Sequence, residues 1–178
     1  FISEDGTMFG EEYTLVAVAD YVLCQTPGPT VSNLSSSRAL RDVTRKYGCE
    51  HYTAAVGEVN VVAQMKAVGA VIGGEGNGGI IYPELHYGRD ALVGVGLFLT
   101  LLAKRKMKMT ELRATYPAYY MNKEKIQLTP EVDVDGILSA VKKEYAEEEV
   151  DDTDGGKIDF ADGWVHRRKS NNEQNIRG

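Results

Sequence analysis

The sequence predicts an α/β protein in which a mixed α-β-α layered domain is followed by a smaller α+β domain. Two observations lead to this prediction. From residue 11 to residue 104, segments with helical periodicity alternate with short apolar segments, the order typical of a layered sheet with parallel strands. After Tyr116-Pro117 the composition changes, and strand-like segments surround one amphipathic helix.

The first domain is expected to alternate helices and strands. Its helices carry apolar residues three or four positions apart, and its strands are short and rich in β-branched residues. Ser35 to Ser37 can cap the second helix, Gly48 can end it, and Asp90 is a suitable N-cap for the last one. The expected helices span residues 11–23, 38–47, 58–68 and 90–104, and the expected strands span residues 30–34, 49–56 and 70–72.

The second domain is expected to contain three strands and one helix. The strands span residues 119–128, 157–160 and 164–168, and the helix spans residues 135–147 with apolar residues on one face. An acidic run, residues 147–152, lies between them. We interpret it as a solvated loop in preference to a metal site.

The composition is that of a globular chain, with 43% hydrophobic and 26% charged residues. A net charge of -6 argues against a general nucleic-acid binder. The longest apolar run, residues 91–103, falls short of the roughly 20 residues of a membrane-spanning helix, so no membrane partner is expected. Cys24 and Cys49 have no metal-type spacing and are expected to be reduced and buried. The chain begins without a signal-peptide pattern, so we expect a cytoplasmic location.

The segment GGEGNGG, residues 73–79, raises the question of a ligand. Gly74, Gly76 and Gly79 satisfy the dinucleotide pattern G-x-G-x-x-G, but that pattern requires a helix directly after it. Here the β-branched residues and proline of residues 80–83 indicate an extended segment instead. A tight turn with structural glycines is one alternative. The other is a sugar site, since the Glu75 carboxylate and the Asn77 amide can together meet vicinal hydroxyl groups.

A second polar segment, residues 167–173 followed by Arg177, carries arginine, lysine, serine and asparagine side chains. Arginine offers paired donors that match phosphate oxygens, and serine and asparagine supply further donors. The alternative is a basic surface turn. Hydroxyl recognition by one loop and phosphate recognition by another would together suit a phosphosugar.

These polar segments resemble motifs of a known family. GGEGNGG, with HYGRDAL at residues 86–92, resembles the sugar-binding loop of the α-D-phosphohexomutases, which comprise phosphoglucomutases, phosphomannomutases and phosphoglucosamine mutases. WVHRRKSNNE, residues 164–173, together with Arg177 resembles their phosphate-binding loop. Residues 1–10 are similar to the segment that follows the family's metal-binding loop. The resemblance covers nearly the whole chain.

This resemblance implies a domain assignment. Residues 1–10 would be the tail end of metal-binding domain 2, and residues 11–116 would be the sugar-binding α/β domain 3. Residues 117–178 would be an incomplete phosphate-binding domain 4 with an α+β fold like that of the TATA-binding protein. The family's phosphoserine and the ligands of its Mg²⁺ lie in domains 1 and 2. We therefore expect no catalytic and no metal-binding residue here, and the rest of the same polypeptide is the expected partner.

The resemblance also implies the roles of individual residues. The expected sugar-binding residues are Glu75, Gly76 and Asn77, and the expected phosphate-binding residues are Arg168, Ser170, Asn171, Asn172 and Arg177. Lys169, Asn172 and Gln174 depart from the family pattern, and the missing prolines should leave the phosphate loop less preorganised. A histidine such as His86 is more often structural than ligand-binding.

The function implied is the substrate-recognition half of a phosphohexomutase. Such an enzyme moves a phosphoryl group between C1 and C6 of a hexose phosphate through a bisphosphate intermediate. The alternatives are a non-catalytic phosphosugar-binding module and a structural domain with incidental loops. The choice among glucose, mannose and glucosamine phosphates stays open, because no residue here can be assigned to C2.

Overall fold

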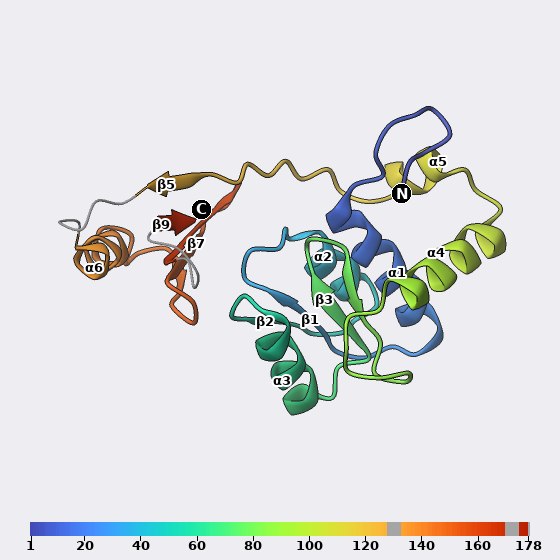
Figure 1. Cartoon of the computed structure of the whole chain (residues 1–178), viewed down its shortest axis with the longest axis horizontal. Helices are drawn as coiled ribbons and strands as arrows, with labels where there is room; N and C mark the ends of the chain where they lie inside the picture. Colours follow the sequence, from blue (N-terminus) through green and yellow to red (C-terminus); the bar gives the residue numbers. More distant parts are fainter. Residues whose placement is uncertain (128–132, 170–174, 178) are drawn as a thin grey trace. The chain divides into compact units, whose positions relative to one another are not determined.

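The computed structural model describes residues 1–127, 133–169 and 175–177, and the chain divides into two units. Phe1–Tyr119 form the first unit and Tyr120–Gly178 the second (Figure 1). Ser170, Asn171 and Asn172, three of the expected phosphate-binding residues, lie outside the described residues.

The first unit contains a four-stranded mixed sheet. Its strands are β1 (Thr30–Asn33), β2 (His51–Ala54), β3 (Ile72–Glu75) and β4 (Gly79–Ile81), in the order β2-β1-β3-β4. β1 runs parallel to both β2 and β3, whereas β4 returns antiparallel to β3 as a hairpin. The predicted parallel arrangement of the first three strands is therefore confirmed.

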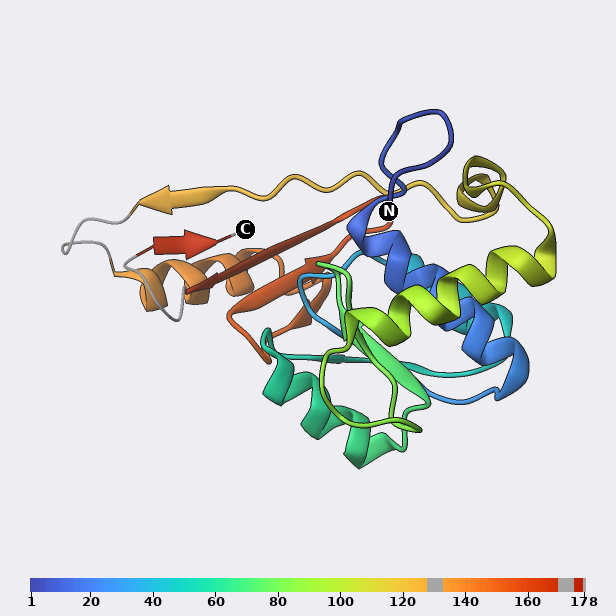
Figure 2. The ribbon, with the colours of Figure 1, turned by 45° about the vertical axis from the view of Figure 1, so that its right-hand side comes forward.

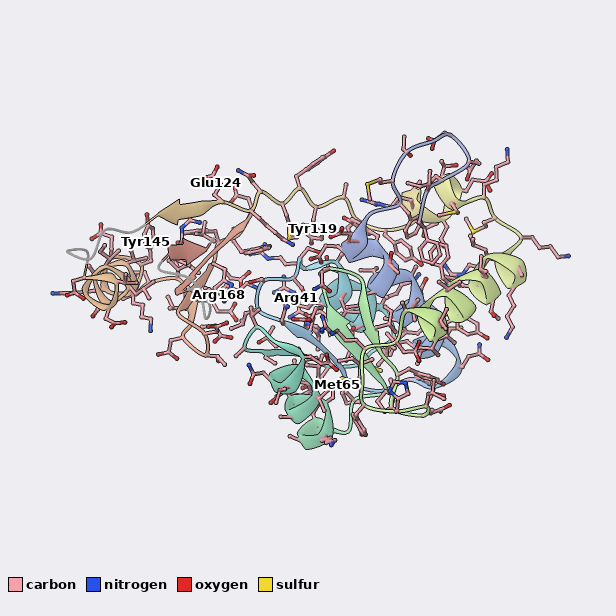
Figure 3. The ribbon with its side chains drawn as sticks, viewed as in Figure 1. Arg41, Met65, Tyr119, Glu124, Tyr145 and Arg168 are labelled. Carbon is pink, nitrogen blue, oxygen red and sulfur yellow. The ribbon has the colours of Figure 1, made fainter. Side chains whose placement is uncertain are left out.

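Helices cover both faces of this sheet, which confirms the predicted α-β-α layering. On one face α1 (Glu11–Gln25), α2 (Ala39–Lys46) and α4 (Ala91–Arg105) share a core cluster with Ile72 and Ile80. On the other face α3 (Glu58–Val68) packs against the sheet through Val61 and Met65, which share a cluster with Ile81 (Figure 3). Figure 2 shows α1 and α4 lying side by side, and their residues share the first cluster. Asp90 caps α4 as predicted, because its Oδ1 accepts hydrogen bonds from the amides of Leu92 and Val93.

The strand expected at residues 70–72 lies further along the chain, at Ile72–Glu75, so part of the expected loop is strand. Gly73 and Gly74 pair with Val31 and Ser32 of β1, in the interior of the sheet. A Cβ on Gly73 would lie 2.6 Å from the Met65 sulfur and 2.8 Å from the Val31 carbonyl oxygen. These glycines therefore allow close packing within the sheet, a requirement that their sequence pattern does not reveal.

A short helix, α5 (Met109–Ala114), was not predicted from the sequence. The Glu4 carboxylate accepts hydrogen bonds from the backbone amides of Met109 and Thr110, at the start of this helix. Phe1 stacks on Phe98 of α4, with the ring centroids 4.0 Å apart. The N-terminal segment thus packs against α4 and α5 within the first unit.

A fully buried carboxylate, Asp20 of α1, joins several elements of the first unit. The hydroxyls of Tyr47 and Tyr116 donate to it at 2.5 and 2.8 Å, and Arg105 Nη2 lies 2.6 Å from Asp20 Oδ2. Burial and the neighbouring Asp20 carboxylate raise the pKa of both tyrosines, so both stay protonated donors. The buried charge is therefore compensated by one cation and two hydroxyl groups.

The described residues of the second unit form an antiparallel sheet with one helix, as expected for a small α+β domain. Strands β5 (Lys125–Gln127), β6 (Glu149–Asp151), β7 (Gly156–Asp159), β8 (Trp164–Lys169) and β9 (Asn175–Arg177) take the order β5-β9-β8-β7-β6, and the helix is α6 (Val134–Glu144). His166 of β8 is buried, and its Nε2 lies 2.7 Å from the backbone oxygen of Asp154. Burial lowers the pKa of His166, which favours the neutral imidazole donating from Nε2.

Several expectations for this unit were wrong in detail. Within the described residues, the strand expected at residues 119–128 is limited to β5. The acidic run, expected as a loop, contributes β6, which pairs with β7 so that Asp151 lies opposite Lys157. Solvent on the outer side of an edge strand accommodates such charges. α6 ends at Glu144, before the expected residue 147.

Two further findings concern the whole described chain. Cys24 is exposed and Cys49 half-buried, so the expectation of burial is wrong for Cys24. No helix in the described ranges is both long and apolar enough to cross a membrane.

Candidate sugar and phosphate sites

Glu75 ends β3, and its carboxylate is buried, with only 5% of the residue exposed. Asn33 Nδ2 donates to Oε1 at 3.0 Å, and Arg89 Nη1 lies 3.1 Å from Oε2. Both oxygens therefore have a protein partner. Since each carboxylate oxygen has two lone pairs, each oxygen can accept one further hydrogen bond.

A chain of hydrogen bonds fixes the orientation of Glu75. The Gly76 amide donates to Ser36 Oγ at 3.1 Å, Ser36 Oγ donates to Asn33 Oδ1 at 2.9 Å, and Asn33 Nδ2 donates to Glu75. Because the carboxylate can only accept, the Nδ2 end of the Asn33 amide faces Glu75 and the Oδ1 end faces Ser36. A Cβ on Gly76 would collide with the Glu12 carboxylate, so a larger residue here would require the Glu12 side chain to move.

Arg89 connects Glu75 to a second carboxylate. Arg89 Nε donates to Glu58 Oε2 at 2.7 Å, and the Arg89 amide donates to Glu58 Oε1 at 3.2 Å. Glu58 lies at the start of α3, and its side chain is 34% exposed. The hydrogen bonds from Arg89 lower the pKa of Glu58, so this carboxylate is ionised at neutral pH.

The turn between β3 and β4 brings Asn77 to the surface. The Gly78 amide donates to the Glu75 carbonyl at 3.1 Å, and Gly78 has a φ of 87°, a conformation that favours glycine. Asn77 Oδ1 accepts from the Gly79 amide at 3.1 Å. The Nδ2 group of the exposed Asn77 is the end of this amide that remains for a ligand.

Two clefts flank this turn. One has a volume of about 490 Å³ and the other of about 400 Å³. The larger cleft is lined by Glu58, Asn77, Gly78, Gly79, Arg89, Asp90 and Ala91. Of the expected sugar-binding residues, the structure places Asn77 on the cleft wall, whereas Glu75 is buried against Arg89 and Gly76 lies against Glu12.

His86 supports the loop that carries Arg89. Its Nε2 lies 3.1 Å from Asp90 Oδ2, and its Nδ1 accepts from the Gly88 amide at 3.0 Å. Both ring nitrogens are therefore used within the loop, in agreement with the structural role expected for His86.

Arg168, the first of the expected phosphate-binding residues, lies on β8 of the second unit (Figure 3). Its Nε is 3.9 Å from Asp154 Oδ2, and its side chain is 11% exposed. The strand register places Arg168 opposite Arg177 of β9. The two arginines thus start from neighbouring backbone positions on either side of the expected phosphate loop.

A metal site is not formed by the residues that the structure describes. They contain no group of three or more histidine, cysteine, aspartate or glutamate side chains placed to hold a metal ion. The Mg²⁺ that the resemblance implies therefore finds no fitting donor set here, and we derive no step through it.

The first unit is a layered α/β domain with a cleft, lined by carboxylate and amide side chains, beside its β3–β4 hairpin, and a small antiparallel domain follows it in the chain. Residues 10–119 match the family described as phosphoglucomutase/phosphomannomutase, alpha/beta/alpha domain III. The chain belongs to this family.

Similar proteins carry the corresponding names. The chain is 35% identical to a phosphoglucomutase/phosphomannomutase of Thermococcus kodakarensis, with 99% of this chain and 39% of the relative covered. It is 30% identical to a probable phosphoglucosamine mutase of Methanopyrus kandleri, with 99% and 40% covered. The chain thus spans about two fifths of the length of these relatives.

Solved structures show the same fold. A phosphoglucomutase/phosphomannomutase family protein of Burkholderia thailandensis superposes with a TM-score of 0.80 at 24% identity, covering 99% of this chain and 38% of that protein. An N-acetylphosphoglucosamine mutase of Aspergillus fumigatus, solved with GlcNAc-6P and magnesium, superposes with a TM-score of 0.65 at 11% identity, covering 99% and 44%.

Sequence reasoning missed Glu58 and Arg89. The two lie 31 residues apart, and only the fold brings the N-terminus of α3 beside the loop before α4. A partial signal was present, because Arg89 belongs to the HYGRDAL segment.

Proposed function

We propose that this chain is the substrate-recognition half of a phosphohexomutase, an enzyme that moves a phosphoryl group between C1 and C6 of a hexose phosphate through a bisphosphate intermediate. Family membership and the names of the relatives support an isomerase of this class. The covered share of those relatives supports further domains in the same polypeptide, and a phosphoserine and Mg²⁺ would belong there.

The observation that carries the sugar-binding part is the charge of the larger cleft. Glu58 and Asp90 line it and Glu75 is paired with Arg89, which is the one cation among its described lining residues. Carboxylates outnumber guanidinium groups, so the cleft repels a phosphate. Carboxylate acceptors and the Asn77 amide donor suit neutral hydroxyl groups.

The phosphate would then bind to the second unit. Arg168 and Arg177 flank residues 170–174, and arginine binds phosphate oxygens with paired, charge-assisted hydrogen bonds. Holding the hydroxyls in one place and the distal phosphate in another orients the reacting end of the sugar. Such positioning is a major part of catalysis of phosphoryl transfer.

The test is a nuclear magnetic resonance titration of the isotope-labelled chain with glucose 6-phosphate, glucose and inorganic phosphate in parallel. Glucose should shift the amides of Asn77, Gly79 and Ala91, inorganic phosphate should shift those around Arg168, and glucose 6-phosphate should shift both sets. Asn77→Ala should weaken the glucose response, and Asn60→Ala, which removes an exposed hydrogen bond to the Val56 carbonyl outside the cleft, is the matched control.

Inorganic phosphate that shifts the Asn77 and Gly79 amides, with no response to glucose, would refute the proposed division of roles. The rival function, a non-catalytic phosphosugar-binding module, predicts the same titration. Mutase activity of the longer polypeptide separates the enzyme from the module.

A further inference from the structure

Arg89 makes two ion pairs through one guanidinium group. Its Nε lies 2.7 Å from Glu58 Oε2, and its Nη1 lies 3.1 Å from Glu75 Oε2. The two carboxylates come from different elements, the start of α3 and the end of β3. Two like charges at one site repel each other, so a shared cation is required to keep them together.

The neighbouring backbone leaves room for this arrangement. A Cβ on Gly79 would lie 2.7 Å from Arg89 Cδ and 3.2 Å from Asn77 Oδ1. The aliphatic part of Arg89 therefore runs over Gly79, at the base of the turn that presents Asn77. A shift of the turn at Gly79 would therefore also shift the Arg89 side chain.

The same unit contains a second ion pair, between Arg105 and Asp20, which differs from the Arg89 ion pairs in that it lies outside both clefts. Arg105 pairs with Asp20, whose side chain is 1% exposed and lines neither of the two clefts. Arg89, in contrast, is 45% exposed and lines the larger cleft together with Glu58. A ligand in that cleft would therefore contact the Arg89 ion pairs directly.

We propose that Arg89 is a positioning residue that holds the carboxylates of Glu58 and Glu75 side by side, oriented to accept hydrogen bonds from two neighbouring sugar hydroxyl groups. Glu58 is thereby a second hydroxyl acceptor in addition to Glu75. A lysine cannot replace this arginine fully, because an ammonium group is a point charge without the planar fork that bridges two acceptors. This inference rests on the proposed function for the identity of its ligand.

Four charged or titratable groups lie near Glu58, and a titration must distinguish the midpoint of Glu58 from the midpoints of the groups that titrate. Arg89 bonds to it directly, and Glu75 lies on the other side of that guanidinium. Asp90 lines the same cleft, and His86 is bonded to Asp90. A titration of Glu58 is therefore compared with the same titration of His86→Gln, which identifies any midpoint that belongs to the imidazole.

The first measurement needs no ligand. The side-chain carboxyl carbon of Glu58 is followed by nuclear magnetic resonance as the pH is lowered, with Glu58→Gln to assign the signal. Arg89→Gln should raise the Glu58 midpoint, since the opposite charge and its hydrogen bonds are lost. Arg89→Lys keeps a charge and should give an intermediate midpoint, and Arg45→Gln, which removes an exposed charge outside both clefts, should leave the midpoint unchanged. An unchanged midpoint in folded Arg89→Gln and Arg89→Lys overturns the proposal.

The second measurement is a double-mutant cycle on glucose 6-phosphate affinity. Arg89→Gln and Glu75→Gln should each weaken binding about tenfold. Because Arg89 acts through the carboxylates, the double variant should lose clearly less than the product of the two losses. Losses that simply multiply would show that Arg89 acts independently of Glu75 and would overturn the proposal. A wild-type chain that binds no hexose phosphate overturns the proposed function, while the Glu58 midpoint still decides whether Arg89 holds the carboxylates.

Discussion

Replacement of Glu75 by glutamine tests the sugar site most directly. The carboxylate accepts from Asn33 Nδ2 and from Arg89, two donors that face different oxygens. A glutamine has one oxygen, so its NH₂ group must face one of these donors. Asn33 cannot turn its amide over without losing the hydrogen bond from Ser36. One buried donor is therefore left unpaired, which should destabilise the unit by about 1–3 kcal/mol.

The effect on ligand binding follows from the loss of charge. A hydrogen bond to an ionised group is stronger than a neutral one, and a difference of about 1.4 kcal/mol corresponds to roughly tenfold in affinity. We expect Glu75→Gln to weaken glucose 6-phosphate binding by about this factor, measured by calorimetric titration at fixed ionic strength. Glu84→Gln is the matched control, because Glu84 is exposed, accepts from Tyr82 and lines neither of the two clefts.

The sign of the result decides between two roles for the turn. If the turn held a phosphate, removal of the negative charge of Glu75 would strengthen binding, because the carboxylate repels an anion. Tighter binding of glucose 6-phosphate to Glu75→Gln would therefore refute the assignment to sugar hydroxyls. Binding of inorganic phosphate to the second unit should stay unchanged in this variant.

Three further outcomes are expected. The 178-residue chain alone should show no mutase activity, and conversion of glucose 1-phosphate above a contaminant control would contradict this. Arg168→Ala should weaken hexose phosphate binding roughly 10- to 100-fold, for a charge-assisted contact of about 1.5–3 kcal/mol, whereas Asp154→Asn should not weaken it, because it removes an anion that competes for Arg168. His166 has a pKa lowered below 6.5 by burial, so its contribution to stability is complete above about pH 6.5 and is lost as the pH falls towards the folded-state pKa. Urea unfolding between about pH 5 and pH 7.5 should show this slope, and His166→Gln should reduce it.

Local sequence patterns predicted much of the fold because many helix and strand boundaries depend on contacts between residues close together in the sequence. The cap of α4 is an example, since Asp90 and the amides that it accepts from are only two and three residues apart. α5 is the opposite case, because the carboxylate at its N-terminus, Glu4, lies 105 residues before Met109. The end of β3 was placed wrongly, at residue 72 in place of Glu75, because Gly73 and Gly74 have low strand propensity and pairing with β1 overrides that preference.

In the candidate site too, the residues within one short segment were predicted and the contacts between distant segments were not. Glu75 and Asn77 stand in one short glycine-rich segment, which was enough to suggest hydroxyl recognition. The sequence did not show that Glu75 is held by Asn33, 42 residues away, or that Arg89 joins it to Glu58. Such contacts depend on the order of strands in the sheet, which no local pattern encodes.

The burial of Asp20 sets a limit on how far the first unit can be shortened. Its partners arrive one after another along the chain: Tyr47 first, then Arg105, and last Tyr116. A chain that ends before Arg105 leaves a carboxylate without its cation in the interior, and breaking a buried pair in this way costs about 3–5 kcal/mol. We therefore expect a segment that ends before Arg105 to be destabilised even if it contains every strand of the first sheet. During synthesis, the buried charge of Asp20 in α1 is neutralised only after Arg105, near the end of the first unit, has been added to the chain.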